Sequence, residues 1–211
     1  MSEQGKRGPR GYRMVRRRET LQAMRRRITE AAFELHGSLG PANTTIKAVA
    51  ERAGVQRHTV YNHFPDMASL FRACTDHGML STGMPSAGGW LAIADPADRL
   101  QYGLDDMYAY YRANSGVLRN VLRDMEMMAT VGGVEPMLER MAELFSTLAA
   151  GWPGDASAQH LRGVTIAHAM AFDTWRSFAE RGVPDPQLRD LMVRMVGTID
   201  PAYQPEATTG R

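Results

Sequence analysis

The apolar positions of this chain recur with the period of a helix, most clearly between Thr44 and Phe64. Four of them have the i, i+3, i+4, i+7 spacing that gathers apolar side chains on one helix face: Ile46, Val49, Ala50 and Ala53. Thr44 or Thr45 can cap the first turn of such a helix, and Gly54 can adopt the left-handed conformation that ends it. The pattern therefore predicts a short amphipathic helix that stops at Gly54.

A second short helix is predicted directly after this turn, ending before Pro65, which a helix does not easily pass. Val60 and Phe64 would point back at the first helix, and polar side chains would face outward. This is the layout of a helix-turn-helix. An outward arginine can pair with guanine and an outward asparagine with adenine, so the layout favours DNA binding. The alternative is a pair of solvated helices in an ordinary bundle.

The stretch reads TTIKAVAERAGV and then TVYNHFPD, and it resembles the DNA-binding domain of the tetracycline-repressor (TetR) family of bacterial transcription regulators. The resemblance covers roughly Ile28 to Phe71, where ITEAAFELHGSLG is similar to the first helix of the family and DMASLF to the start of its fourth. It implies that Thr45 and Tyr61 lie at DNA phosphates. Met67 stands where members often carry lysine, so one phosphate contact is expected to be absent.

The resemblance also implies that several side chains of the motif face bases or the DNA backbone, and a cluster of arginines just before the first helix extends this basic surface. The predicted DNA-contacting residues are Thr45, Lys47, Arg57, His58, Thr59, Tyr61, Asn62, His63, Arg16, Arg17 and Arg18.

The rest of the chain also shows helical periods, and no segment alternates convincingly like a strand. Residues 1–18 are rich in Gly and Arg without an apolar period, so we expect a disordered basic arm and a first helix from about Glu19. Asp95 is a candidate N-cap, with Pro96 at the first helical position. Further helices are predicted over residues 66–80, 95–113, 117–128, 137–148, 157–180 and 186–199. The chain is therefore expected to be all-α, with about nine helices.

Charge is divided unevenly along the chain. Residues 1–65 hold 13 Lys or Arg and 5 Asp or Glu, a net charge of +8, whereas residues 66–211 hold 12 and 18, a net charge of −6. A basic part joined to an acidic part is typical of a nucleic-acid-binding domain fused to one that avoids phosphate. The predicted organisation is a disordered arm over 1–18, a helix-turn-helix DNA-binding domain over 19–65, a ligand-binding and dimerisation domain over 66–200, and a disordered tail over 201–211.

The last two predicted helices carry more apolar residues than a monomer's surface would. They are either two buried core helices or, as the resemblance implies, half of a four-helix bundle completed by a second subunit. The predicted dimer-interface residues are Leu161, Trp175, Leu188, Leu191, Met192, Met195, Val196 and Ile199.

The middle of the chain is rich in Met and Tyr, which line irregular cavities well but are also ordinary core residues. The resemblance favours a pocket for a small hydrophobic or amphipathic ligand, because the C-terminal helices of the family usually enclose one. The predicted lining residues are Met107, Tyr108, Tyr111, Asn114, Asp124, Met125, Met128, Met141, His168, Phe172 and Asp173.

Other chemistry is not favoured by the sequence. The single cysteine, Cys74, cannot form an intramolecular disulfide, and no apolar run approaches the length of a membrane span, so a cytoplasmic protein is expected. His168 and Asp173 are spaced wrongly for a metal pair, and we find no phosphate loop and no nucleophile elbow. We therefore predict a homodimeric, ligand-released repressor without a cofactor or catalytic residues. The alternative is a helical carrier or enzyme whose basic head does not bind specific DNA.

Overall fold

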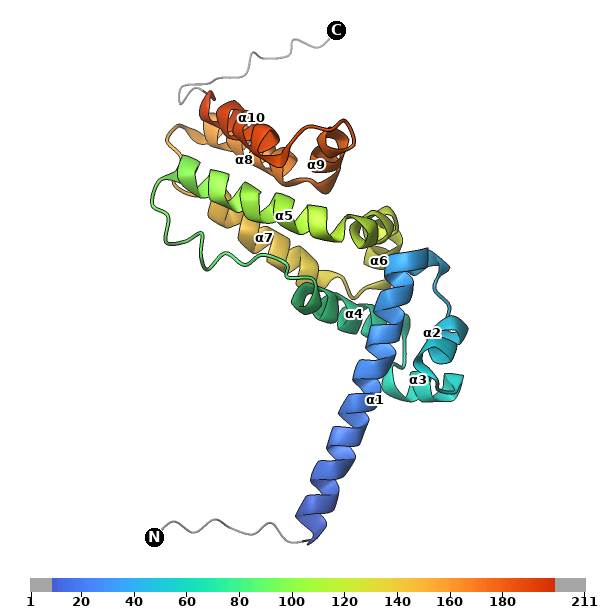
Figure 1. Ribbon diagram of the computed structural model, residues 1–211. Coiled ribbons are helices and arrows are strands. Elements are labelled where there is room, and N and C mark those ends of the chain that lie inside the picture. The colour runs from blue at the N-terminus through green and yellow to red at the C-terminus, as the bar shows by residue number, and fades with distance from the viewer. Residues whose placement is uncertain (1–8, 200–211) are drawn as a thin grey trace, which may run out of the picture. The chain divides into compact units, whose positions relative to one another are not determined.

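The computed structural model describes residues 9–199, with side chains from Arg13 onward, and this part of the chain folds into helices joined by turns and loops (Figure 1). The helices are α1 (Pro9–Leu39), the 3-10 helix η1 (Pro41–Asn43), α2 (Ile46–Ala53), α3 (Arg57–His63), α4 (Met67–Ser81), α5 (Pro96–Arg123), α6 (Met125–Val131), α7 (Glu135–Ala149), α8 (Ala156–Met170), α9 (Phe172–Ala179) and α10 (Asp185–Gly197). The predicted all-α fold is confirmed. None of these helices combines the length and apolar character that crossing a bilayer requires.

The described chain forms two compact units. The first contains the residues up to Gly78 together with Gly116–Glu135, and the second contains Met79–Ser115 together with the residues from Pro136 onward. The predicted boundary at residue 65 therefore does not coincide with a boundary between compact units. Sequence periodicity could not show that the segment Gly116–Glu135 packs with the N-terminal helices, because the contact joins residues far apart in the chain.

The helix-turn-helix lies in the first unit and forms as the apolar pattern predicts. Thr45 caps α2, since its Oγ1 accepts a hydrogen bond from the Ala48 amide at 3.1 Å, and Gly54 ends the helix at a φ of 63°. Val60 and Phe64 point inward and are 0% and 1% exposed. They join a buried core made of Ile28, Ala31, Ala32, Val49, Ala50, Ala53, Val60, Phe64, Leu70 and Cys74.

The first helix starts earlier than predicted. α1 begins at Pro9 rather than near Glu19, so the expectation of a disordered arm is wrong for residues 9–18. Proline is tolerated at the first helical position, where its missing amide is not needed, and arginine is a good helix former. The prediction gave Gly and Pro too much weight. Residues 1–8 of the arm and the predicted tail 201–211 lie outside the described part of the chain.

α5 starts as predicted and runs further than predicted. The Asp95 carboxylate accepts hydrogen bonds from two first-turn amides at 2.8 and 2.9 Å, which is the expected N-cap. The helix then continues past Ala113, its predicted end, to Arg123. Asn114, a weak helix former, is held in the helix because its Nδ2 donates to the Tyr110 carbonyl one turn earlier at 2.9 Å.

The single helix predicted over residues 157–180 is two helices in the second unit. α8 and α9 are separated at Ala171, whose backbone is extended. A helix end leaves carbonyls without an intrahelical partner, and here two buried tyrosines supply the donors. The hydroxyls of Tyr108 and Tyr111 donate to the carbonyls of the two residues before the break at 2.9 and 2.5 Å. The sequence pattern of α8 and α9 alone gives no sign of these bonds from α5.

Candidate nucleic-acid interface

The outward face of α3 carries the hydrogen-bonding groups expected of a DNA-reading helix. Arg57, His58, Tyr61 and Asn62 are all exposed, Tyr61 to 53%. Residues three and four apart along a helix are neighbours on its surface, so Tyr61 lies beside both Arg57 and His58, and Asn62 lies beside His58. Val60 is buried on another side of α3. The four exposed side chains offer a guanidinium, an imidazole, a phenol and an amide within a single patch.

Thr59 and His63, also predicted to contact DNA, are partly buried at the edges of this patch. On α2, Lys47 is exposed and lies 3.8 Å from Glu51 in a solvent-exposed ion pair, which is weak and leaves the ammonium able to exchange partners. Thr45 uses an oxygen lone pair for the α2 cap, so its hydroxyl proton remains available to a phosphate.

α3 is held in place by an arginine that the sequence pattern did not single out. The Arg25 guanidinium lies over the Phe64 ring, 4.1 Å from its centroid, and its Nη1 donates to the His63 carbonyl at 2.5 Å. A cation at this position also suits the partial negative charge of a helix C-terminus. Arg25 enters the sequence analysis only through the net charge. Apolar periodicity cannot predict that an arginine on α1 contacts α3.

The remaining predicted DNA contacts lie on α1. Arg16, Arg17 and Arg18 are exposed, on a helix rather than on the flexible arm that was expected. Met67, at the start of α4, is partly buried and packs against the core of the first unit. The position at which family members often carry lysine therefore has an apolar role in this chain.

Three of the predicted ligand-pocket residues belong to the first unit and have structural roles there. Asp124 is 9% exposed and accepts hydrogen bonds from Arg123 and from the Ala42 amide, and these bonds hold the pKa of its carboxyl below the usual range. Met128 is buried against Phe71, and Met125 packs on the same cluster. The structure uses these three residues to attach α5 and α6 to the N-terminal helices, and their assignment to a ligand pocket stays a prediction.

The other predicted lining residues lie in the second unit. Met107, Tyr108, Tyr111 and Phe172 are buried core residues, and burial raises the pKa of both tyrosines. Met141 is partly buried. His168 and Asp173 are exposed, and Asp173 pairs with Arg176 at 3.0 Å.

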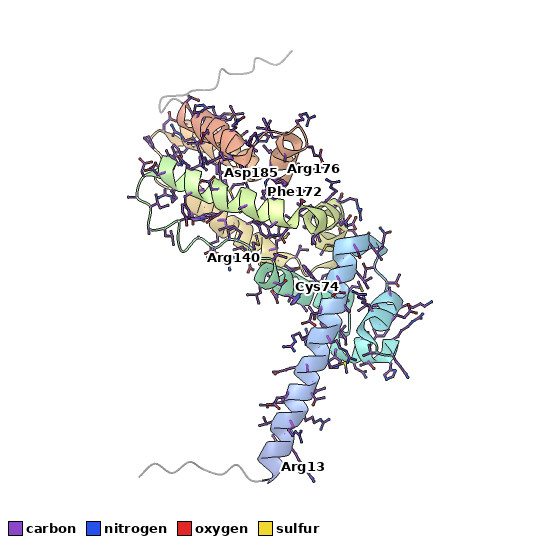
Figure 2. The ribbon with its side chains drawn as sticks, in the orientation of Figure 1. Arg13, Cys74, Arg140, Phe172, Arg176 and Asp185 are labelled. Carbon is purple, nitrogen blue, oxygen red and sulfur yellow. The ribbon has the colours of Figure 1, made fainter. Side chains whose placement is uncertain are left out.

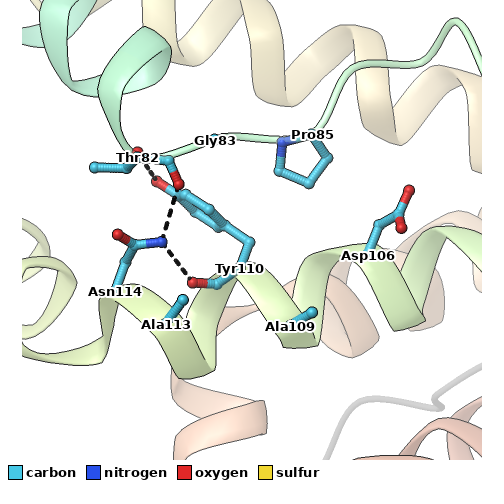
Figure 3. A pocket seen from close by; sticks show the side chains of 8 residues that line it. All are labelled: Thr82, Gly83, Pro85, Asp106, Ala109, Tyr110, Ala113 and Asn114. Atoms are coloured by element: carbon cyan, nitrogen blue, oxygen red, sulfur yellow. Dashed lines mark hydrogen bonds between the residues drawn. The ribbon is translucent and has the colours of Figure 1, made fainter.

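The second unit does contain a pocket of about 410 Å³ between α5 and the chain segment that follows α4 (Figure 3). Its lining residues are Thr82, Gly83, Pro85, Asp106, Ala109, Tyr110, Ala113 and Asn114. Only Asn114 was predicted. Its amide donates to the Thr82 carbonyl at 3.2 Å, which fixes the loop beside the helix. The Asp106 carboxylate accepts from Trp90 Nε1 at 2.8 Å and adds a negative charge. The pocket was not predicted because three of its eight lining residues, Thr82, Gly83 and Pro85, lie in a loop without periodicity.

The predicted dimer surface is only partly available to a second subunit. Trp175, Leu188, Met192 and Val196 are at most 4% exposed, so they face the core of their own subunit, and their assignment to an interface is wrong. The apolar stripe of α10 is wide enough to serve both a core and a surface, and the sequence alone did not separate its two sides. The exposed and partly exposed members are Leu191, Met195, Leu161 and Ile199, and Val164 on α8 adds to them at 55% exposure.

Comparison with known proteins decides the family. Residues 28–74 match the family model of bacterial regulatory proteins, tetR family. An HTH-type transcriptional repressor of Mycobacterium tuberculosis is 30% identical over 153 residues, which are 72% of this chain and 71% of that protein. The chain belongs to the TetR family. It is thus a DNA-binding transcription regulator, and the α2–α3 pair is its helix-turn-helix.

Two solved structures agree with this fold. A TetR-like regulator from Rhodococcus sp. RHA1 superimposes with a TM-score of 0.56 at 16% identity, over 82% of this chain and 93% of that one. RolR, solved in complex with its ligand resorcinol, gives a TM-score of 0.50 at 18% identity, over 88% of this chain and 98% of that one. At these identities the likeness concerns the fold alone.

Proposed function

We propose that this regulator is a cytoplasmic repressor that binds a palindromic operator as a homodimer and is released when a small molecule binds to its second unit. The observation that carries DNA recognition is the outer face of α3, where a guanidinium and a carboxamide stand exposed on a helix whose other side is buried. Repression is supported by the Mycobacterium tuberculosis relative, which is named a transcriptional repressor.

A homodimer is supported by the exposed apolar residues of α8 and α10, Val164, Leu191 and Met195. A two-fold dimer presents its two α3 helices to successive major grooves ~34–36 Å apart, and its operator is then an inverted repeat. A change in that separation prevents both helices from docking at once, which is how a ligand would release the DNA.

The ligand is a small amphipathic molecule that carries a hydrogen-bond donor. The pocket on α5 offers apolar walls from Pro85, Ala109 and Ala113, and the Asp106 carboxylate can accept a hydrogen bond from the ligand. A volume of about 410 Å³ suits a molecule of one or two rings. Resorcinol, the ligand of the similarly folded RolR, is of this chemical class.

Selection of random duplex DNA by the purified protein tests DNA recognition. The expected product is an inverted repeat whose half-sites are one helical turn apart, and Arg57→Ala should abolish its enrichment. Failure to enrich any sequence, together with no retention on a DNA column at moderate salt, would instead favour a helical carrier or enzyme with a basic head.

A ligand screen against the operator complex tests the release. Native mass spectrometry should detect a small amphipathic molecule that binds and lowers operator affinity, and Asp106→Asn should weaken its binding. By linkage, the operator must lower the affinity for that molecule by the same factor. A protein that stays on its operator with every molecule able to bind it would be a constitutive regulator.

A further inference from the structure

The N-terminal half of α1 continues beyond the packed core of the first unit. Ile28 is the first α1 residue that is fully buried, and Met24, one turn earlier, is partly buried against the core. From Arg13 to Ala23 only Val15 is even partly buried. We call residues 13–23 the α1 extension. Figure 1 shows it running past α2 and α3, and Figure 2 labels Arg13 close to the N-terminal end of α1.

The α1 extension is strongly basic. It carries four arginines, and Glu19 is its only acidic residue. Arg13 and Arg17 are one turn apart and both exposed, so their like charges repel each other on the same helix face. This helical segment buries little apolar area, and its like charges repel each other. A partner with a row of negative charges would therefore stabilise it.

We propose that the α1 extension is a second DNA-contacting surface, which binds phosphates of the duplex flanking the base pairs that α3 reads. This rests on the proposed operator binding. From Ile28 to Arg13 the helix rises ~22 Å, which matches about six base pairs of duplex. The first unit thereby holds two surfaces for the same polyanion: the face of α3, which carries base-reading groups, and the extension, which carries charge alone.

The helical form of the extension also determines how it contacts DNA. A flexible arginine arm could enter the minor groove, but an α-helix is ~10–12 Å wide and the minor groove of B-DNA ~6 Å. The extension therefore lies against the backbone or in the wide groove and does not read the narrow groove. Its contribution should be independent of the flanking sequence, without a preference for A/T-rich flanks.

The apolar residues of the extension do not favour another partner. Met14 and Leu21 are exposed, at 63% and 50%, and lie seven residues apart on one side of the helix. A coiled coil with a second copy needs three or four consecutive heptads with apolar residues at two positions in each, and an interfacial membrane helix needs a wide apolar face. Two exposed apolar side chains seven residues apart provide neither, whereas four arginines provide the charge that phosphates neutralise.

The test compares two triple variants of the full chain. Arg13→Gln with Arg17→Gln and Arg18→Gln removes three charges and keeps helix propensity, because Gln and Arg are similar helix formers. The matched control changes the same three residues to Lys and keeps the charges. Both proteins are titrated, over a range of salt concentrations, with two duplexes: the selected operator core alone, and the same core with ten base pairs added on each side.

On the flanked duplex, the Gln variant should lower the slope of log affinity against log salt by ~0.9 for each phosphate that it no longer neutralises, up to ~2.7 for three. The Lys variant should keep the wild-type slope, and on the bare core all three proteins should agree. Exchange of the flanks between A/T-rich and G/C-rich sequence should change neither result.

An unchanged slope for the Gln variant on the flanked duplex would overturn the inference while leaving operator binding intact. A Lys variant as weak as the Gln variant would overturn a contact made by charge alone, since that result requires the bidentate hydrogen bonding of a guanidinium. Binding of the wild type, but not of the Gln variant, to vesicles of anionic phospholipid together with an unchanged DNA slope would assign the surface to membranes. If the wild type does not bind the operator core, the proposed function itself is contradicted, and this result is distinct from a failure of the α1 extension to bind phosphates.

Discussion

At the scale of single residues, the outer face of α3 separates base reading from phosphate binding. Arg57→Ala should cost ~1–3 kcal/mol on the selected operator and less on random DNA, because a bidentate arginine contact discriminates between bases. Tyr61→Phe should weaken both complexes alike if its hydroxyl reaches a phosphate. Fluorescence anisotropy with both duplexes measures the two variants. Equal losses on both sequences for Arg57→Ala would make Arg57 a phosphate contact.

Arg25 supports α3 from behind, and its removal should destabilise the first unit. Arg25→Met keeps the aliphatic stem over Phe64 but removes both the hydrogen bond to the His63 carbonyl and the cation on the ring. A decrease of about 1–2 kcal/mol in the free energy of unfolding is expected, since Arg25 is exposed and solvent screens part of both interactions. Urea unfolding measures it. Arg26→Met is the control, because Arg26 makes only an exposed pair with Glu30 and should change stability by less than ~0.5 kcal/mol.

His36 makes the stability of the first unit depend on pH. It is 2% exposed, beside Phe71, and burial lowers its pKa to about 4 although the nearby Asp124 opposes this. The unfolded chain binds the proton near pH 6.5 and the folded chain does not, so stability is full above pH 6.5 and falls as the pH drops toward 4. The decrease attributable to this histidine is at most about 3 kcal/mol.

Denaturant unfolding between pH 7 and 4.5 should show this decrease in the wild type. His36→Gln, which cannot take up the proton, should have a flatter profile even if its stability at pH 7 is lower. A variant with the same slope as the wild type would show that other groups, such as carboxylates with lowered pKa, cause the acid sensitivity. Asp124 is expected to act only at lower pH, because its ordinary pKa is already 3.8 and the fold lowers it further.

At the scale of helices, local sequence predicted starts and stops well where a cap residue is present. Thr45, Gly54 and Asp95 act at the positions expected of them, because a cap depends on side chains only two or three residues away. The start of α1 and the end of α5 were missed. Each of these helices contains a residue with low helix propensity, Gly11 in α1 and Asn114 in α5. Local helix propensity alone therefore predicted these ends poorly.

The break between α8 and α9 gives a prediction at this scale. Tyr111→Phe leaves the Met170 carbonyl without the hydroxyl that donates to it at 2.5 Å, in a site where Tyr111 itself is 4% exposed. An unsatisfied buried carbonyl costs about 1–3 kcal/mol, so the melting temperature should fall by several degrees. Tyr102→Phe on the same helix is the control, because Tyr102 is 50% exposed and its hydroxyl can bond to water. Similar melting temperatures for the two variants would show that the break does not depend on the Tyr111 bond.

At the scale of the whole molecule, what the sequence could not show is which distant segments pack together. The helix-turn-helix motif and the basic residues 1–65 could be predicted because each is a continuous stretch of sequence. The two units, in contrast, are each assembled from separated segments. The same limit explains the mixed ligand set, in which Asp124 and Met128 were placed with residues of the other unit. It also explains why a stripe on α10 could be found but not divided into a buried and an exposed side.

That division sharpens the test of the dimer. Met192 is 3% exposed, so an acidic substitution there would disrupt the subunit itself and could not report on an interface. Leu191 and Met195 are 40% and 39% exposed on the same helix. Leu191→Asp with Met195→Asp should therefore leave the helical circular-dichroism spectrum unchanged and convert dimers to monomers in light scattering, because two charges would have to be desolvated in an apolar contact.

The matched control places two aspartates elsewhere on the second unit. Leu91 and Leu138 are 69% and 52% exposed, outside α8 and α10, so Leu91→Asp with Leu138→Asp adds the same charge without touching the proposed interface. This protein should stay dimeric and keep its operator affinity. The monomeric α10 variant should lose the operator but retain weak binding to random DNA, because each subunit keeps its own α3 and its own arginines. A folded α10 variant that remains fully dimeric would place the interface on another surface.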